Sequence, residues 1–297
     1  MLPHLPEVSV IVATYQRPRH LLLSLMSLAL QRGVEGRFEV VVTDDGSADQ
    51  TPDIVNCFTK STEFPVRFVT QEHRCFHPAR CRNNGVLASR APYLVFCDGD
   101  CIVPSNYIEQ HLRARRRGVA RTGDSYRLDR TISEYIDHAS IRSGAFVHCV
   151  GQPERYRMRQ RWVRELIYST IRHPRKPRTM AGNLAVWRKD FERINGFDEE
   201  FVGWGCEDDD LGDRLRQSGV RIAPIFGYTQ GYHLWHQPDP SRPKKWRDGA
   251  NVEYFLRRKK PVLCSIGLSA HKRLAEIPHL TAPAQRAVWS PSRITAA

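Results

Sequence analysis

Short apolar runs alternate along the first hundred residues with longer stretches in which apolar residues recur at helical spacing. The runs are rich in β-branched and aromatic residues, as buried strands of parallel sheets are. They cover residues 8–12, 38–42, 66–70 and 93–97. After the first run, Pro18 precedes leucines spaced as in a helix with proline in its first turn. Strands that alternate with helices predict an α/β fold with a doubly wound, mostly parallel sheet.

Polar side chains follow three of the four predicted strands. Thr14 and Arg17 follow the first strand, Asp45 follows the second, and Asp98 and Asp100 follow the fourth. Ligands of such sheets bind beyond the carboxyl ends of the strands, so we expect a ligand site at this edge. Taken alone, the Asp-Gly-Asp sequence is also typical of an Asx turn that leaves a strand.

A second acidic cluster follows a Gly-Trp-Gly turn later in the chain. Residues 207–210 are four consecutive carboxylates, and Leu211, Leu215 and Gly219 are spaced as in a helix that ends near the glycine. Adjacent like charges pack poorly in a core, whereas the helix dipole stabilises first-turn carboxylates by roughly 0.3–1 kcal/mol each. The run therefore predicts a site. The alternative is an acidic N-cap on a solvated helix.

Metal binding is a further expectation. The sequence contains neither a Gly-x-Gly-x-x-Gly fingerprint after the first strand nor a P-loop, so a nucleotide, if one is bound, must be held differently. Carboxylates can accept from a base or a ribose, or hold a cation that neutralises a diphosphate. A single histidine is more often structural, but His233 and His236 lie three residues apart beside aromatic residues. We expect at least one of them to ligate a metal.

Two other segments contribute to the expected cleft. Residues 73–85 predict a loop that enters a helix, where Arg80 and Arg82 either contact a phosphate or only solvate the helix start. Residues 179–187 begin with small residues, including Gly182, and continue as an alternating apolar run. We expect a strand there whose bare backbone lines the cleft.

Arginines dominate the segment from residue 154 to 178. Aromatic and aliphatic residues lie among them, which predicts a basic, partly amphipathic helix that can lie on an anionic membrane. The alternative is a solvated basic face or a mobile loop. The arginines are Arg155, Arg157, Arg159, Arg161, Arg164, Arg172, Arg175 and Arg178. From residue 261 on no clear periodicity remains, so we expect this tail to pack loosely or to end in disorder.

Composition restricts the partners. The 297 residues suffice for two sub-domains around one cleft, and a formal net charge of +13 draws the chain to nucleic acid, anionic lipid or phosphorylated substrates. Eight cysteines without a Cys-x-x-Cys pair favour reduced thiols in the cytosol over a zinc site or a disulfide framework. The N-terminus lacks the features of a signal peptide, and the longest apolar run, residues 21–30, is too short to span a bilayer. These features predict a cytoplasmic protein, soluble or peripheral on the inner face of the membrane.

In combination, the motifs resemble glycosyltransferases of the GT-A type. The first half is similar to the inverting family 2 enzymes, and the second half to the β-1,4-galactosyltransferases and bacterial chondroitin polymerases. The resemblance spans residues 8 to about 240. It rests on residues 10–17, Asp44-Asp45-Gly46-Ser47, residues 81–85, Asp98-Gly99-Asp100, Gly182-Asn183 and residues 195–210. It implies a Rossmann-like GT-A fold with a nucleotide-sugar-binding domain and an acceptor-binding sub-domain.

The resemblance implies a donor site for a nucleoside diphosphate sugar, expected to be a UDP-sugar. Thr14, Arg17 and Asp45 would contact the nucleoside, with Asp45 at the base. Asp98 would hold the ribose or a metal-bound water, and Gly182 would lie against the donor.

The resemblance also implies a metal site. Asp100, together with His233 or His236, would bind Mn²⁺ or Mg²⁺. This metal and Arg82 would stabilise the leaving diphosphate.

On the acceptor side, the resemblance implies Trp204 as a floor shared by donor sugar and acceptor, with Asp209 nearby. Asp208 would be the catalytic base of a single inverting displacement, with Glu207 beside it. The acceptor would be a hydroxyl of a glycan or of a lipid-linked saccharide. Cys206 stands where the galactosyltransferases have a glycine, so galactose specificity is not carried over.

Two alternatives to this function remain open. One is a retaining enzyme similar to polypeptide GalNAc-transferases. The other is a non-catalytic glycan-binding module, which the intact acidic motifs disfavour. The absence of any RNP, zinc-finger or helix-turn-helix pattern argues against a third alternative, a basic nucleic-acid-binding module. The expected organisation is a donor-binding half at 1–124, an acceptor-binding and catalytic half at 125–260, and a C-terminal extension at 261–297.

Overall fold

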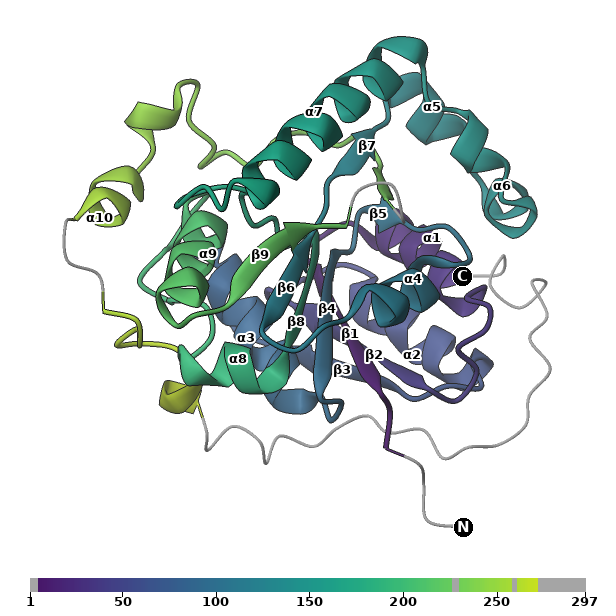
Figure 1. The fold of residues 1–297 in the computed structure, drawn as a ribbon. Coiled ribbons are helices and arrows are strands. Elements are labelled where there is room, and N and C mark those ends of the chain that lie inside the picture. The colour runs from purple at the N-terminus through teal and green to yellow at the C-terminus, as the bar shows by residue number, and fades with distance from the viewer. Residues whose placement is uncertain (1–4, 226–229, 258–260, 272–297) are drawn as a thin grey trace.

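A seven-stranded, mostly parallel sheet forms the centre of the protein (Figure 1). The computed structural model describes residues 5–225, 230–257 and 261–271. The sheet order is β3-β2-β1-β4-β8-β6-β9, and β8 runs antiparallel to both of its neighbours. The strands are β1 (Val8–Thr14), β2 (Phe38–Asp44), β3 (Val66–Thr70), β4 (Tyr93–Asp98), β6 (Val119–Thr122), β8 (Asn183–Trp187) and β9 (Arg221–Pro224). All the strands predicted from apolar runs are present, and the fold class is confirmed.

Helices cover both faces of this sheet. Successive strand side chains point to opposite faces, so Val10 packs in one apolar cluster and Ile11 in the other. The first cluster includes side chains of α1 (Pro18–Ala29), α2 (Thr51–Ser61) and α4 (Tyr107–Ala114). The second includes side chains of α3 (Pro78–Ala88), α8 (Arg188–Arg193) and α9 (Glu207–Gln217). Pro18 and Pro78 occupy the first turns of their helices, where a missing backbone N–H costs nothing.

A small second sheet lies beyond the carboxyl ends of the central strands. Its order is β5 (Cys101–Ile102), β10 (Gly231–His233) and β7 (Ser125–Arg127). Because β10 pairs antiparallel with β5, His233 lies opposite Cys101, and the backbone N–H of Leu234 donates to the Asp100 carbonyl at 2.9 Å. This pairing brings the end of β4 together with a segment more than 130 residues later in the chain.

The helices after β7 lie above the central sheet in Figure 1. They are α5 (Arg130–Tyr135), α6 (His138–Ser143), the 3₁₀ helix η1 (Ala145–His148) and α7 (Gln152–Thr170). The predicted basic helix is therefore present as α7, but it ends at Thr170, eight residues before the end of the arginine-rich segment. None of the helices in the described ranges is both long enough and apolar enough to cross a bilayer.

The C-terminal part contains η2 (Trp246–Asp248), α10 (Val252–Leu256) and η3 (Leu268–His271). The expectation of loose packing is wrong for residues 261–271, because Cys264 and Leu268 are buried. The side chain of Asn195 donates to the Cys264 carbonyl at 2.9 Å and accepts from the Ser269 N–H at 2.8 Å. These contacts are made by single residues in a loop and in the short 3₁₀ helix η3, so they leave no periodic pattern in the sequence. Residues 272–297 lie outside the described ranges, and the proposed domain boundaries remain predictions.

Candidate active site

A cleft of about 710 Å³ lies between the carboxyl edge of the central sheet and the small sheet. Arg80 is not among the lining residues, but the other thirteen candidates for this site are, although they come from positions 14 to 236 of the chain. They are Thr14, Arg17, Asp45, Arg82, Asp98, Asp100, Gly182, Trp204, Glu207, Asp208, Asp209, His233 and His236. The structure thus brings the predicted residues together, while the role of each stays a prediction.

The two consecutive aspartates after β2 have different surroundings. Asp44 holds the turn, since its carboxylate accepts from the Ser47 N–H at 2.8 Å and from the Thr70 hydroxyl at 2.8 Å. Asp45 faces the cleft, where it accepts from the His77 N–H at 2.9 Å and from the Gln71 amide at 2.5 Å. Burial raises the pKa of Asp45 above its usual range, and these hydrogen bonds oppose the shift. Asp45 is therefore the member of the pair that can meet a ligand.

Asp100, His233 and His236 form a cluster suited to a metal ion. One ligand atom of each lies within 4.8 Å of the others, and the described part of the chain holds no other such group of three. Asp100 Oδ2 lies 3.1 Å from His236 Nε2, and Oδ1 lies 3.5 Å from His233 Nε2. Burial opposes ionisation of Asp100, but the histidines and Arg17 hold the pKa of its carboxyl well below the usual range. An ionised carboxylate with two imidazoles is a donor set that fits a divalent transition metal such as Mn²⁺.

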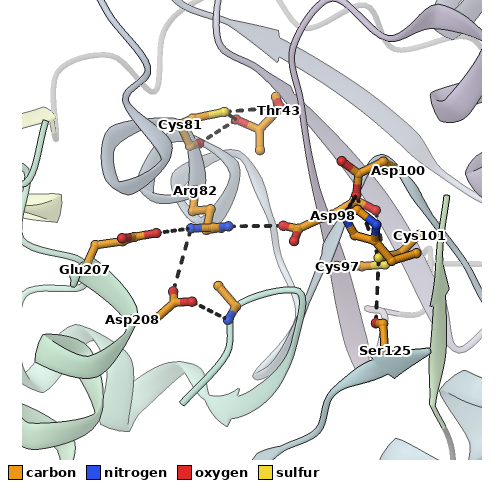
Figure 2. A network of polar contacts seen from close by, with 12 residues as sticks. Thr43, Cys81, Arg82, Cys97, Asp98, Asp100, Cys101, Ser125, Glu207 and Asp208 are labelled. Atoms are coloured by element: carbon orange, nitrogen blue, oxygen red, sulfur yellow. Dashed lines mark hydrogen bonds and ion pairs between the residues drawn. The ribbon is translucent and has the colours of Figure 1, made fainter. Parts of the chain in front are cut away.

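Arg82 of α3 lies among three carboxylates (Figure 2). Its guanidinium nitrogens are 3.1 Å from Asp98 Oδ1, 3.3 Å from Glu207 Oε1 and 3.8 Å from Asp208 Oδ1. Burial would lower the pKa of Arg82, but these carboxylates raise it above its ordinary value. The alternative of a solvated helix start is wrong for Arg82, because the side chain is 9% exposed and spans the cleft floor between α3 and α9. The positive charge of Arg82 is therefore already paired with three carboxylates of the protein itself.

Asp208, in the first turn of α9, has one carboxylate oxygen held and one without a hydrogen bond. Oδ2 accepts from the Ala181 N–H at 3.1 Å, whereas Oδ1 is buried and has no hydrogen-bond partner in the described structure. Burial, followed by the charge of Glu207, raises the pKa of Asp208 to about 8, although Arg82 opposes the shift. Such a carboxyl is a stronger base than an ordinary aspartate once it is ionised, which requires a pH of about 8 or above.

The other acidic residues of α9 are also engaged, so the alternative of a merely solvated N-cap is wrong. Asp210 is buried and accepts from Arg214 Nε at 2.6 Å. Asp209 forms an ion pair with Arg178 at 3.3 Å and lines the cleft. Residues i and i+2 of a helix lie about 200° apart, which separates Asp208 from Asp210.

Two backbone positions explain residue choices at the site. A Cβ at Gly182 would lie 2.6 Å from Asp98 Oδ2, so only glycine allows this carboxylate its position. Cys206 has a φ of 75°, in the left-handed region that favours glycine, which gives a physical reason for glycine in the galactosyltransferases. The Cys206 side chain belongs to an apolar cluster with Phe201 and Val252, although it also reaches the cleft lining.

Several lining residues were missed from the sequence because no motif identifies them. Trp204 was predicted, but Trp235 and Trp246 also line the cleft, and all three are more than one-third exposed. Tyr15 lines it as well and stacks on His73 with ring centroids 4.2 Å apart. The one available signal was the density of tryptophans between positions 204 and 246. Exposed tryptophans in a cleft are suited to stack against sugar rings.

Two family models match the chain. Residues 9–127 match the model described as glycosyl transferase family 2, and residues 167–237 match the model described as the N-terminal domain of galactosyltransferase.

Curated relatives include a validoxylamine A glucosyltransferase of Streptomyces hygroscopicus subsp. limoneus. It is 29% identical over 242 residues, which cover 74% of this chain and 50% of that protein. A chondroitin synthase of Escherichia coli is 26% identical over 280 residues, which cover 86% of this chain and 40% of that protein. The chain therefore spans about half the length, or less, of these relatives.

Solved structures with the same fold include a mannosyltransferase from Pyrobaculum calidifontis in complex with GDP-Man and Mn²⁺. Its TM-score is 0.53 at 19% identity, with 74% of this chain and 55% of that chain covered. The TarS protein of S. aureus, residues 1–349 with UDP, has a TM-score of 0.54 at 18% identity, covering 76% and 60%. The chain has the GT-A fold, and it is similar to family 2 glycosyl transferases over residues 9–127 and to galactosyltransferases over residues 167–237, in the order that the sequence predicted.

Proposed function

We propose that the protein is a metal-dependent, inverting glycosyltransferase that moves a sugar from a nucleoside diphosphate donor to an acceptor hydroxyl. The observation that carries this proposal is the carboxylate of Asp208, whose Oδ1 accepts no hydrogen bond from the described residues and which lines the same cleft as the Asp100, His233 and His236 cluster. A candidate base without a donor site nearby, or a metal cluster without a candidate base, would support glycosyl transfer much less strongly.

The donor side is formed by the ends of β1, β2 and β4. Asp45 is the candidate contact for a base N–H, and Thr14, Tyr15 and Arg17 line the same part of the cleft. The related solved structures were obtained with GDP-Man, UDP-GlcNAc and UDP, which supports a nucleotide sugar. We propose a UDP-sugar as the donor, without galactose specificity.

Asp100, His233 and His236 are the residues that would hold Mn²⁺ or Mg²⁺. When bound, such an ion neutralises the charge of the leaving diphosphate. Arg17, whose Nη1 lies 3.4 Å from Asp100 Oδ2, adds positive charge on the same side. Besides stabilising the leaving diphosphate, Arg82 holds three neighbouring carboxylates in place.

On the acceptor side, Asp208 takes the proton from the attacking hydroxyl. The Ala181 N–H fixes Oδ2 and Arg82 lies 3.8 Å from Oδ1, so the carboxylate is held in place while it accepts the proton. Attack on the face of the anomeric carbon opposite the diphosphate inverts its configuration in one step. Trp204 and Asp209 border this part of the cleft, and a glycan or a lipid-linked saccharide is the proposed acceptor.

We also propose that the enzyme acts in the cytoplasm, where it can associate peripherally with membrane. All eight cysteines are free in the structure, including the exposed Cys57, Cys75 and Cys149, which supports a reducing compartment.

A panel of nucleotide sugars tests the activity directly. The protein is incubated with each donor in Mn²⁺ and in EDTA, and release of the nucleoside diphosphate is measured. We expect release with one donor class in Mn²⁺ alone, and a product of opposite anomeric configuration by NMR once an acceptor is found. Retention of configuration would exclude the inverting mechanism, and equal release in EDTA would exclude the metal requirement.

A further inference from the structure

The outward face of α7 combines an apolar stripe with arginines that form no ion pair within the described part of the chain. Tyr156, Val163 and Ile167 are 64%, 45% and 53% exposed, and their spacing places them within about 40° of one another around the helix. Leu166 and Trp162 extend the stripe on one side, with exposures of 47% and 37%. Exposed apolar side chains that lie contiguously on one helix are typical of an interaction surface.

The arginines of α7 fall into two groups, and only one faces outward. Arg157 and Arg161 point inward, where both form ion pairs with Asp124 Oδ2. The sequence-based expectation that these two arginines bind a membrane is therefore wrong, because the buried carboxylate of Asp124 holds them. Arg159 and Arg164 are exposed and have no ion-pair partner among the residues that the structure describes. Around the helix, Arg164 borders the stripe on one side, and Arg159 lies within it between Val163 and Leu166.

The inner face of α7 is an ordinary packing face. Met158, Glu165 and Ser169 are buried there, at spacings that repeat every three to four residues. The outward stripe is thus not needed to hold the helix on the domain. Beyond the helix, Ile171 is 63% exposed, and Arg172 and Arg175 are also exposed, so the same surface continues past Thr170.

We propose that the outward face of α7, defined by Tyr156, Arg159, Trp162, Val163, Arg164, Leu166 and Ile167, docks on an anionic lipid bilayer. Aliphatic and aromatic side chains enter the acyl boundary, while the arginines meet anionic headgroups. The overall charge of +13 favours the same partner.

Other occupants fit this face less well. Nucleic acid would use the arginines but not the aliphatic stripe. A second copy of the chain would bury the stripe but would bring the arginines of both copies together, and like charges disfavour that contact. An anionic bilayer can contact both the apolar side chains and the arginines of this surface.

Docking through this face has a consequence for the proposed enzyme. Arg161, on the inner face of α7, lines the cleft. The lipid surface and the cleft would then be separated by one helix, about 10–12 Å thick with side chains. This arrangement would suit a lipid-linked acceptor, but the docking itself does not depend on the proposed glycosyl transfer.

Vesicle co-sedimentation tests the proposal without donor or acceptor, so its outcome is separate from that of the activity assay. The full chain is mixed with vesicles of phosphatidylcholine that contain 30% phosphatidylglycerol, and with pure phosphatidylcholine vesicles, at about 50 mM salt. We expect clear binding to the anionic vesicles and at least tenfold weaker binding to the neutral ones. Equal binding to both compositions, or no binding to either, would overturn the proposal.

Paired variants test the two parts of the surface separately. Leu166→Gln with Ile167→Gln keeps good helix formers and should weaken anionic vesicle binding at least tenfold. Arg159→Gln with Arg164→Gln should weaken it by a similar factor, since each basic residue near such a surface contributes about fivefold at low salt. The matched control is Lys189→Gln with Arg193→Gln on α8, which removes the same charge from an exposed site elsewhere on the domain.

The outcomes of this series are distinct. Vesicle binding that falls in both α7 variants and persists in the α8 variant supports the proposal. Equal weakening in the α7 and α8 arginine variants would mean a diffuse charge effect and would overturn it. Light scattering that shows a dimer in the unaltered chain and a monomer in Leu166→Gln with Ile167→Gln would assign the face to a second copy instead. Melting temperatures within a few degrees of the unaltered chain show that each variant is folded.

Discussion

The guanidinium of Arg82 donates to Asp98 Oδ1 at 3.1 Å, which joins the helix after β3 to the end of β4 at the floor of the cleft. The same guanidinium reaches Glu207 and Asp208 on α9. Carboxylates from the end of β4 and from the start of α9 therefore share one cation. A change at any member of this group is expected to affect the others, and the predictions below use that coupling.

Asp208→Asn should reduce sugar transfer by about 10²–10⁴-fold, because the amide keeps the shape of the side chain but cannot accept the proton. Binding of UDP and metal should persist. The assay is turnover with donor and acceptor, together with UDP affinity by calorimetry. Asp213→Asn is the matched control, since Asp213 lies on the same helix outside the cleft, paired with Arg216 at 3.4 Å. Near-normal transfer by Asp208→Asn would show that another group is the base.

The transfer rate should rise with pH up to about 8. Burial and Glu207 raise the pKa of Asp208 to about 8, so below that pH the carboxyl is mostly protonated and cannot act as a base. The rate should fall by up to tenfold per pH unit on the acid side. Rates measured between pH 5.5 and 9 at saturating donor provide the check. A flat profile in the unaltered enzyme would contradict the assignment, whereas Asp208→Asn should itself be flat.

Arg82→Gln should move the midpoint of that pH profile upward. Arg82 lowers the pKa of Asp208, so its removal leaves Asp98, Glu207 and Asp208 to repel one another and stabilises the protonated form. Arg82→Lys keeps one charge but cannot bridge the carboxylates in the same way, so a smaller shift is expected. The measurement is the pH dependence of transfer for both variants. A midpoint that stays in place would mean that Arg82 does not control the ionisation of Asp208.

Gly182→Ala should raise the KM for the donor at least tenfold. The added Cβ would lie 2.6 Å from Asp98 Oδ2, so the carboxylate or the β8 backbone must move. Gly151→Ala is the matched control, because its Cβ would meet only Pro153 at 3.7 Å. The measurement is the KM for the donor, with the melting temperature as a check on folding. If Gly182→Ala and Gly151→Ala behave alike, the close approach to Asp98 has no functional role.

UDP should stabilise the protein only when a divalent metal is present. Without metal, the Asp100 carboxylate would repel the diphosphate. At one hundred times its dissociation constant, a ligand adds about 2.7 kcal/mol to the free energy of unfolding. Thermal shifts with UDP are compared in Mn²⁺ and in EDTA, and Asp100→Ala should remove the Mn²⁺-dependent part. Equal shifts in Mn²⁺ and in EDTA would contradict metal binding at this cluster. The same measurements on His233→Ala and His236→Ala would show which of the two imidazoles binds the metal.

The sequence by itself determined the strands and the edge at which the site lies. Residues 8–12 and 38–42 are apolar except for Ser9 and Glu39, and such runs are typical of strands that are buried on both faces. Carboxyl ends of parallel strands meet at one edge, so the positions of Asp45 and Asp98 near one cleft followed from topology. The start of α9 was also predictable, because four consecutive carboxylates are tolerated where the helix dipole stabilises them.

Tertiary structure alone decided how these groups are paired. The periodicity of a helix shows which of its residues share a face but not which residues of other elements pack against that face. Arg157 and Arg161 point into the domain because Asp124 forms ion pairs with both of them. In the same way, the antiparallel pairing of β10 with β5 set His233 beside Asp100. The long separation of these segments along the chain leaves no local signal. Burial and ion pairing depend on contacts between segments that are distant in sequence. Such contacts place Arg82 among the carboxylates of Asp98, Glu207 and Asp208 in the cleft.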